Sequence, residues 1–274
     1  MCAPGCIEHV HHAVSRRGLF KGAAAAGATI GAAVAMPGAA EARRFPRFQR
    51  VVDLTHTLTP EFPTFFGVPG VGLRKIKDFK TDGFNVNEWT VLEHAGTHID
   101  APIHFSATGA GPAEIAIDQL VVPLAVIDVS AKASRDADYQ LDPADIAVWE
   151  KRHGRLPRGA CVALYSGWET HLGSGRFAGK DDKGVFHFPG FHPEATAMLL
   201  ERRNIAGLAV DTLSLDHGPS KEFKTHTTWL PAGRWGVENM AGLGNVPPAG
   251  ATLVVGAPKV KGASGGPARV YALV

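Results

Sequence analysis

The chain has 274 residues, 45% of them hydrophobic, with 28 lysines and arginines against 26 aspartates and glutamates. This length is sufficient for one sizeable hydrophobic core. Because the charges nearly balance and form no basic patch or stripe in the sequence, we expect neither a nucleic-acid nor a membrane-surface partner.

The first 42 residues resemble an export signal. The arginine pair Arg16 and Arg17 stands ahead of an Ala- and Gly-rich apolar run, as in the twin-arginine signal. The segment 40–42 has the Ala-x-Ala form of a cleavage site. We therefore expect a periplasmic protein whose mature domain is 43–274. An uncleaved N-terminal anchor is the alternative.

Removal of this segment takes away three of the 28 basic and two of the 26 acidic residues, which leaves 25 against 24. Cys161 is then the one cysteine that remains, so an intrachain disulfide is impossible. Because Cys161 lies in an apolar, strand-like run, we expect a buried structural thiol and not a nucleophile.

Short apolar runs alternate with helical patterns along the rest of the chain, which predicts a single α/β domain with more strand than helix. Two helices have clear start signals. Asp142-Pro143 opens one to about residue 152, and His192-Pro193 opens another that ends before residue 207. The predicted strands are 50–54, 86–93, 124–129, 161–165, 207–211, 252–257 and 269–274.

Two glycine-rich segments are expected to be irregular. The stretch 167–189 is predicted to be a solvated loop. The stretch 262–267 matches no phosphate-binding fingerprint and is predicted to be a turn between two C-terminal strands. The absence of a G-x-S-x-G nucleophile elbow argues against a serine hydrolase.

The most informative stretch places three histidines and one aspartate within eleven residues: His94, His98, Asp100 and His104. Imidazole nitrogen and carboxylate oxygen are ligands that divalent metals such as zinc prefer. The density of such groups favours a metal site over the alternative, a polar loop without metal.

Neither a helix nor a straight strand suits this stretch. Gly96 and a following proline oppose a helix, and a straight strand would hold His94 and His98 about 13 Å apart. We therefore predict a strand that ends near His94, a bend at Gly96, and an extended piece in which His98 and Asp100 share a face.

A second group of polar residues lies further along the chain. His226 and Glu238 are twelve residues apart, and the polar segment 211–218 follows an apolar strand. Polar side chains at the exit of a strand often line a site in α/β proteins. Taken alone, Glu238 is more typical of a surface carboxylate and His226 of a loop histidine.

Together these segments resemble the cyclase family, which includes bacterial kynurenine formamidases and isatin hydrolases. The pattern His-x-Gly-Thr-His-x-Asp-x-Pro-x-His-Phe at 94–105 is the specific part, and the likeness extends from about Val51 to the C-terminus. The resemblance implies a swivelling β/β/α fold, a homodimer or homotetramer, and metal-dependent hydrolysis of amide-type bonds.

The resemblance also implies ligands for two divalent ions, zinc or alternatively manganese: His94, His98 and Asp100 for the first, and Asp100, His226 and Glu238 for the second. Isatin hydrolases match only the first set, so the second pair favours a formamidase-like, dinuclear arrangement. His104 matches a non-ligand histidine and is the candidate acid–base, with Glu238 as the second catalytic candidate. Phe65 lies in the substrate-side segment, where formamidases carry tryptophan.

We therefore expect an exported, arylformamidase-like hydrolase that cleaves a carbon–nitrogen bond in a small amide, formamide or cyclic amide. Divalent ions lower the pKa of bound water, and an imidazole can carry a proton to the leaving nitrogen. The alternatives are an isatin- or imide-opening enzyme, a lyase or dehydratase, and a non-catalytic periplasmic metal-binding protein. The presence of His104 argues against the last, since pure binding needs no spare base.

Overall fold

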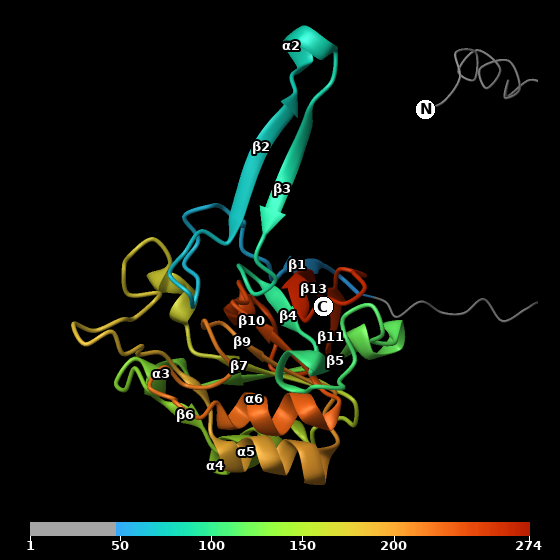
Figure 1. Cartoon of the computed structure of the whole chain (residues 1–274). Coiled ribbons are helices and arrows are strands. Elements are labelled where there is room, and N and C mark those ends of the chain that lie inside the picture. Colours follow the sequence, from blue (N-terminus) through green and yellow to red (C-terminus); the bar gives the residue numbers. More distant parts are fainter. Residues whose placement is uncertain (1–47) are drawn as a thin grey trace, which may run out of the picture. The chain divides into compact units, whose positions relative to one another are not determined.

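The computed structural model describes residues 48–274, so the export signal predicted at 1–42 lies outside the described residues. Within 48–274, nine strands form one sheet: β1 (Val51–Asp53), β4 (His98–Asp100), β5 (Val121–Asp128), β7 (Cys161–Tyr165), β9 (Gly207–Val210), β10 (Trp235–Glu238), β11 (Ala251–Gly256), β12 (Gly265–Pro267) and β13 (Arg269–Leu273). Their order across the sheet is β1-β13-β11-β5-β7-β9-β10-β4-β12 (Figure 1).

The centre of this sheet is parallel and its flanks are antiparallel. β5, β7, β9 and β10 pair in parallel, whereas β11 and β13 on one side and β4 and β12 on the other pair antiparallel. Three helices cover one face (Figure 1): α4 (Pro143–His153), α5 (Pro193–Met198) and α6 (Lys224–Trp229). Because α5 continues into a wider-turned segment, Leu199–Arg203, this helix extends toward β9 as predicted.

The smaller elements lie in the connections. Two short helices are α2 (Phe79–Asp82) and α3 (Ser130–Ala133). Two small sheets pair β2 (Val71–Lys77) with β3 (Val86–Val91), and β6 (Gln140–Leu141) with β8 (Gly190–Phe191). Single 3-10 turns occupy Pro102–Phe105, Ile117–Leu120, Trp168–His171, Leu230–Ala232 and Leu243–Asn245.

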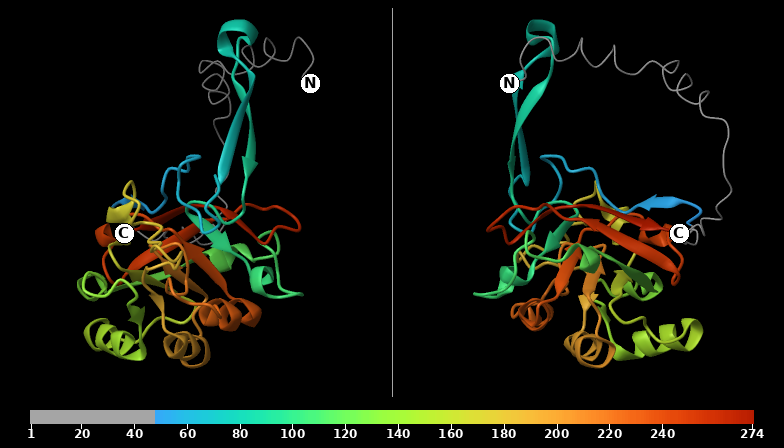
Figure 2. Two further views of the ribbon diagram at one scale, coloured as in Figure 1. Left: turned by 60° about the vertical axis from the view of Figure 1, so that its left-hand side comes forward. Right: turned by 90° about the vertical axis from the view of Figure 1, so that its right-hand side faces the viewer.

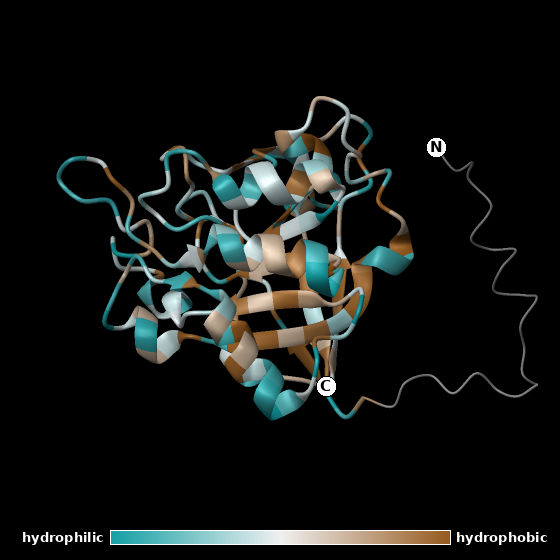
Figure 3. Cartoon of the chain, turned by 90° about the horizontal axis from the view of Figure 1, so that it is seen from below, coloured by the Kyte–Doolittle hydropathy of each residue, from teal (hydrophilic) through white to brown (hydrophobic). Residues whose placement is uncertain are grey.

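Both faces of the sheet are buried, so its central strands are apolar on both sides. Cys161 and Ala163 of β7 belong to one hydrophobic cluster, and Val162 and Leu164 belong to another, on the face that the helices cover. This is the pattern expected of parallel strands with two covered faces. In Figure 3 the strands are largely hydrophobic, whereas the helices also carry hydrophilic residues.

Several sequence predictions are confirmed. The fold is α/β, and the strand 161–165 matches β7. Asp142 caps α4: its carboxylate accepts from the backbone N–H of Asp145, whose side chain accepts from Asp142 in return. Cys161 is fully buried, and burial raises the pKa of its thiol far above the usual range, as expected for a structural thiol.

Two predictions for glycine-rich segments need correction. The stretch 262–267 is not simply a turn, because Gly265–Pro267 forms edge strand β12 against β4. A β-carbon on Gly266 would lie 2.4 Å from Pro258 Cγ, so glycine permits this close approach. The stretch 167–189 is not simply solvated, because Trp168, Phe177 and Phe188 in it form a buried aromatic cluster.

The hairpin of β2 and β3 was only half anticipated, since the sequence predicted β3 but not β2. Both views of Figure 2 show this hairpin standing away from the rest of the domain. Within residues 48–274, the structure contains no helix that is long and apolar enough to cross a membrane.

Candidate metal centre and active site

A bend at Gly96 connects the hairpin to the strand that carries the central ligand candidates. β3 ends at Val91, three residues before His94, and β4 begins at His98. Gly96 has a φ of 61°, in the left-handed region that glycine favours. A β-carbon there would also lie 2.9 Å from Leu58 Cδ1. The predicted bend is therefore confirmed, although the strand ends slightly earlier than expected.

The pairing of β4 with β10 builds the middle of the site. His98 and Asp100 share a face of β4, and His98 lies directly opposite Glu238 of β10. His98 Nε2 lies 3.3 Å from Asp100 Oδ1 and 3.4 Å from Glu238 Oε2. His98 Nδ1 lies 2.9 Å from the carbonyl oxygen of Gly96, which can only accept a hydrogen bond. His98 Nε2 is therefore the nitrogen that faces the two carboxylates.

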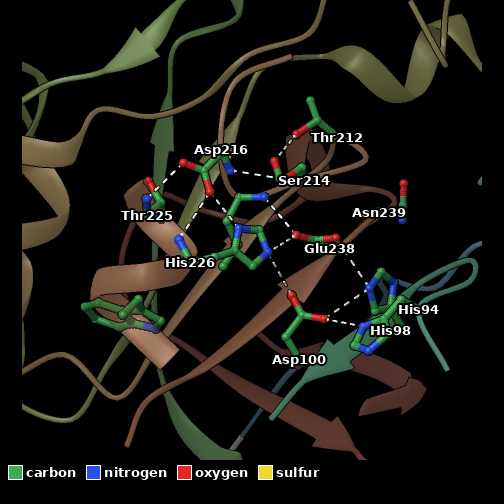
Figure 4. A network of polar contacts seen from close by, with 12 residues as sticks. His94, His98, Asp100, Thr212, Ser214, Asp216, Thr225, His226, Glu238 and Asn239 are labelled. Carbon is green, nitrogen blue, oxygen red and sulfur yellow. Dashed lines mark hydrogen bonds and ion pairs between the residues drawn. The ribbon is translucent and has the colours of Figure 1, made fainter. Parts of the chain in front are cut away.

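His226, on helix α6, lies against the same two carboxylates. The sequence did not predict this helix. His226 Nε2 lies 3.4 Å from Asp100 Oδ2 and 3.1 Å from Glu238 Oε1. On the other side of the ring, Nδ1 lies 2.6 Å from Asp216 Oδ2 (Figure 4). Asp216 also accepts from the backbone N–H of Thr225 and of His226, so this carboxylate fixes the ring orientation.

The buried carboxylates of the centre stabilise positive charge on the groups between them. Burial raises the pKa of Asp100, but the three imidazoles in contact with it outweigh burial and hold it well below its usual value. Burial lowers the pKa of His98, but the adjacent carboxylates of Asp100 and Glu238 prevail and raise it to about 10. The same balance raises the pKa of His226. A cation placed among these groups would be stabilised in the same way.

The donor set fits one or more divalent metal ions. Among the described residues, His98 Nε2 and Asp100 Oδ2 are buried without a hydrogen-bond partner, an arrangement that is costly unless another group satisfies them. Two overlapping groups have ligand atoms within 4.8 Å of one another: His94, Asp100 and His104, and His98, Asp100 and Glu238. Nitrogen and carboxylate donors of this kind suit zinc or manganese.

Asp100 belongs to both groups, as expected of a carboxylate shared by two ions. The division of the other residues differs from the one implied by resemblance, because His98 lies with Glu238 and His94 lies with His104. His94 Nδ1 is 2.7 Å from Asp100 Oδ1. The five ligand roles thus remain predictions, and the structure brings all five side chains to one place.

His104 lies beside this cluster on the 3-10 turn that follows β4. Its ring stacks on His94 with centroids 3.8 Å apart and lies 6.0 Å from the ring of His226. Burial lowers the pKa of His104 to about 4, against an opposing effect of the nearby Asp100 carboxylate. The imidazole is therefore neutral near pH 7.

Sequence reasoning missed a pair of residues that orients His94. Ser264, next to strand β12, donates from Oγ to the carboxylate of Glu93. His94 Nε2 lies 2.9 Å from the same Ser264 Oγ, so the ring is held between Ser264 and Asp100. The glycine-rich run around Ser264 carried the only available signal, because such a run permits close backbone approach.

We expect Gly265→Ala to weaken metal binding. A β-carbon on Gly265 would lie 2.4 Å from the carbonyl oxygen of Ile99 and 2.6 Å from His94 Cε1, so β12 or the His94 ring must shift. Titration of the metal-free protein with zinc should show a loss of affinity on the order of 10–100-fold, as when a ligand loses its support. Gly175→Ala is the control, since no atom lies within 4 Å of the added carbon. Unchanged affinity in Gly265→Ala would show that His94 needs no such support.

A cavity of about 180 Å³ opens onto the centre. Its lining combines the polar centre with an apolar, mainly aromatic wall: Phe65, Phe66, Phe105, Leu213 and Phe223 beside His94, His104, Ser214, His226, Glu238 and Asn239. The sequence singled out Phe65 as a substrate-side residue, and the structure places it in this wall. A buried group of imidazoles and carboxylates at the floor of an apolar pocket is an arrangement typical of an active site.

Comparisons with known proteins identify the family of the chain. The Cyclase family model, described as "Putative cyclase", matches residues 52–217. An isatin hydrolase of Roseibium aggregatum is 31% identical over 243 residues, covering 82% of this chain and 91% of that protein. A kynurenine formamidase of Salinibacter ruber is 24% identical over 185 residues, covering 68% and 78%. The solved structure of isatin hydrolase A from Ralstonia solanacearum has a TM-score of 0.77 and 35% identity, covering 82% and 92%.

The chain therefore belongs to the cyclase family, and the predicted cyclase-like fold is confirmed. Its relatives include hydrolases with substantial coverage of both chains, and we describe it as a cyclase-family hydrolase. The more specific expectation of a formamidase-like enzyme stays a prediction. The isatin-type alternative weighed from the sequence corresponds to relatives with higher identity.

Proposed function

We propose that this protein hydrolyses a carbon–nitrogen bond in a small, uncharged, aromatic cyclic amide, the class to which isatin belongs. The proposal includes two divalent ions, zinc or manganese, held around Asp100. The observation that carries it is the composition of the pocket that opens onto the centre, which is aromatic on its walls and free of lysine and arginine among the described residues that line it.

The pocket walls suit a flat apolar ring. Phe223 lies 6.0 Å from Phe65 and 6.1 Å from Phe105, measured between ring centroids, so the three rings form a continuous surface. Phe105 in turn lies 4.7 Å from the ring of His226, at the floor. An apolar protein cavity of about 150 Å³ accepts benzene, and this one measures about 180 Å³. A single fused or substituted aryl ring is therefore the expected size of the substrate.

The bound metal ions and His104 would have different roles in the hydrolysis. Divalent ions, when bound, polarise the scissile carbonyl and lower the pKa of a water that they bind. His104, neutral near pH 7, accepts a proton from the water that attacks the carbonyl carbon. The carbon–nitrogen bond then breaks, and His104 returns the proton to the leaving nitrogen. Because the substrate is a cyclic amide, the product is one ring-opened molecule that carries a carboxylate and an amine, and one proton goes to solvent. Phe105 and Phe223 keep bulk water from the ring.

The alternative substrate class is an N-formyl aryl amine with a charged amino-acid side chain, as expected of a kynurenine formamidase. Some relatives carry that name. A substrate carboxylate would need a cationic partner, and an ammonium group would need an anionic one. Among the described residues that line the cavity, Glu238 is the one acidic residue. Its carboxylate faces His98 and His226 and is therefore not free to pair with a substrate ammonium group. The pocket therefore favours the uncharged class.

The test compares isatin, phthalimide and N-formylkynurenine with protein supplied with zinc or manganese. We expect isatin ring opening, followed by absorbance, to be fastest and to stop when a chelator removes the metal. Faster cleavage of N-formylkynurenine would overturn the uncharged class while leaving the hydrolase in place. Cleavage of none of the three by protein of confirmed metal content would support a binding protein instead.

A further inference from the structure

The loop 172–189, between the 3-10 turn Trp168–His171 and strand β8, supplies a second layer behind the wall of the active-site cavity. Phe186 in this loop packs against Phe65, and their ring centroids lie 4.6 Å apart at an interplanar angle of 31°. In Figure 1 the yellow loop lies beside the blue segment that carries Phe65. Phe65 lines the cavity, whereas Phe186 is buried and does not line it. Phe186 therefore contacts the wall from behind.

The ring of Phe65 depends on this contact for its orientation. Phe65 lies between β1 and β2, in a segment without helix or strand. Hydrogen bonds of the Thr64 side chain close the turn around it, but they hold the backbone and not the ring. Of the rings that contact Phe65 within residues 48–274, Phe186 is the nearest, since the centroids of Phe66 and Phe223 are 6.2 Å and 6.0 Å away. Aromatic pairs prefer particular relative orientations, so Phe186 is the main support of this ring.

The backbone of Phe186 is itself held in place by the segment after β9. A β-carbon on Gly218 would lie 2.5 Å from the carbonyl oxygen of Phe186, so glycine permits the two backbones to touch. The backbone N–H of Gly218 also donates to the carbonyl oxygen of Phe188 at 2.8 Å. Gly218 lies two residues after Asp216, the carboxylate that orients His226. The loop is therefore packed against a segment that also supports the metal centre.

Charged side chains hold the outer part of the loop. His187 Nδ1 lies 2.8 Å from Asp138 Oδ2, and His187 Nε2 lies 3.6 Å from Asp181 Oδ2. The hydrogen bond to Asp138 raises the pKa of His187, so positive charge is favoured between these two carboxylates. Lys180 forms an isolated antiparallel bridge with Phe186, and its Nζ lies 4.5 Å from the centroid of that ring. A cation over an aromatic face is attracted to it, so the loop presents Phe186 as a fixed support.

The position of the Phe65 ring matters because the cavity is small. Its volume is about 180 Å³, and a cavity of about 150 Å³ already accepts benzene. Little room is therefore left around a single aryl ring, and a tilt of Phe65 would change which substituents fit on it. In an apolar pocket, one extra or missing methylene changes kcat/KM by about 10–200-fold. The selectivity of this wall is thus sensitive to a residue that lies outside the cavity.

We propose that Phe186 is a positioning residue that sets the size specificity of the enzyme by holding the ring of Phe65 in the pocket wall. The proposal rests on the proposed function, in which the substrate is a cyclic amide with one aryl ring. When Phe186 is made smaller, the ring of Phe65 moves into the vacated space, the cavity widens on this side, and substituted aryl rings fit. The aromatic neighbours of Phe186 among the described residues are Phe65 and Phe188, and neither is a ligand candidate. The metal content should therefore not change.

The test compares isatin with four isatins that each carry one bromine on a different carbon of the benzene ring, with metal-loaded full-length enzyme. Phe186→Leu should raise kcat/KM for at least one brominated isatin, relative to isatin, by about tenfold, mainly through KM. The same substitution made in a Phe65→Leu enzyme should give no such shift, because the contact between the two rings is already lost. An equal shift in both backgrounds, or no shift in either, would overturn the proposal.

Phe177→Leu is the matched control, since it makes the same change in the same loop and the same buried cluster. The aromatic neighbours of Phe177 among the described residues are His56 and Phe62, and Phe65 is not one of them. This variant should keep the wild-type ranking of the five isatins. If Phe177→Leu shifts the ranking as Phe186→Leu does, general loosening of the cluster explains the effect and the proposal is wrong.

A second readout needs no substrate. With 4-fluorophenylalanine at position 65, the fluorine NMR resonance should shift and narrow when Phe186→Leu frees the ring, and Phe177→Leu should leave the resonance unchanged. A wild-type enzyme that opens none of the five isatins would overturn the proposed function. A fluorine resonance unaffected by Phe186→Leu would overturn the role of Phe186, whichever substrate the enzyme cleaves.

Discussion

Replacing His104 with alanine is expected to leave the metal content unchanged while turnover falls by roughly 10²–10⁴-fold, the usual contribution of a positioned acid–base group. The imidazole stacks on His94 beside the centre, and burial lowers its pKa to about 4, so it is neutral near pH 7. Metal analysis and kcat on the same preparation are the measurements.

His98→Ala is the matched comparison. His98 is buried between Asp100 and Glu238, so its removal takes a nitrogen donor from the middle of the centre, and metal and activity should be lost together. If His104→Ala is also metal-free, His104 is a ligand and Glu238 becomes the next candidate base. A fully active His104→Ala enzyme would show that the reaction needs no base from this histidine.

Asp100→Asn is expected to remove both ions and all measurable turnover. Among the described residues, Asp100 is the carboxylate that contacts all three imidazoles of the centre, His94, His98 and His226. An asparagine oxygen carries no charge and its amide nitrogen cannot bind a cation, so a site that shares this residue between two ions loses both. Wild-type protein should contain close to two equivalents of zinc or manganese by elemental analysis.

Asp216→Asn provides a graded comparison for the same measurement. Asp216 holds the far nitrogen of His226 and does not face the centre, so its loss should weaken metal binding by about 10–100-fold without abolishing it. Asp182→Asn, at an exposed loop position, should behave as wild type. One equivalent of metal in the wild-type chain, unchanged by His226→Ala, would contradict the two-ion centre.

The position of Glu238 shows why the site depends on the order of strands in the sheet. β10 pairs in parallel with β9 and antiparallel with β4, so Glu238 is fixed opposite His98. The loop after β9 then supplies the backbone N–H of Leu215 to Glu238 at 2.8 Å. Residues that are more than a hundred positions apart in the chain thus meet through backbone pairing alone.

The sequence by itself determined the parts that depend on local chemistry. Period-two alternation and the glycine at position 96 predict that His98 and Asp100 share a face after a bend, because these features act over a few residues. The cap at Asp142 predicts the start of α4, and the apolar run at Cys161 predicts a buried strand, for the same reason. The spacing of His94 to His104 indicated a metal centre before any contact was known.

Only the tertiary structure decided which distant segments meet. Helix α6 has six residues and three threonines, so its local propensity is too weak to predict, and packing of Trp229 in the core stabilises it. Strand β12 consists of two glycines and a proline, which carry no strand signal, and it exists because β4 offers an unpaired edge. The hairpin of β2 and β3 is a third case, since neither of its faces is buried in the single chain. These elements are set by long-range pairing and burial, whose partners cannot be read from the local sequence.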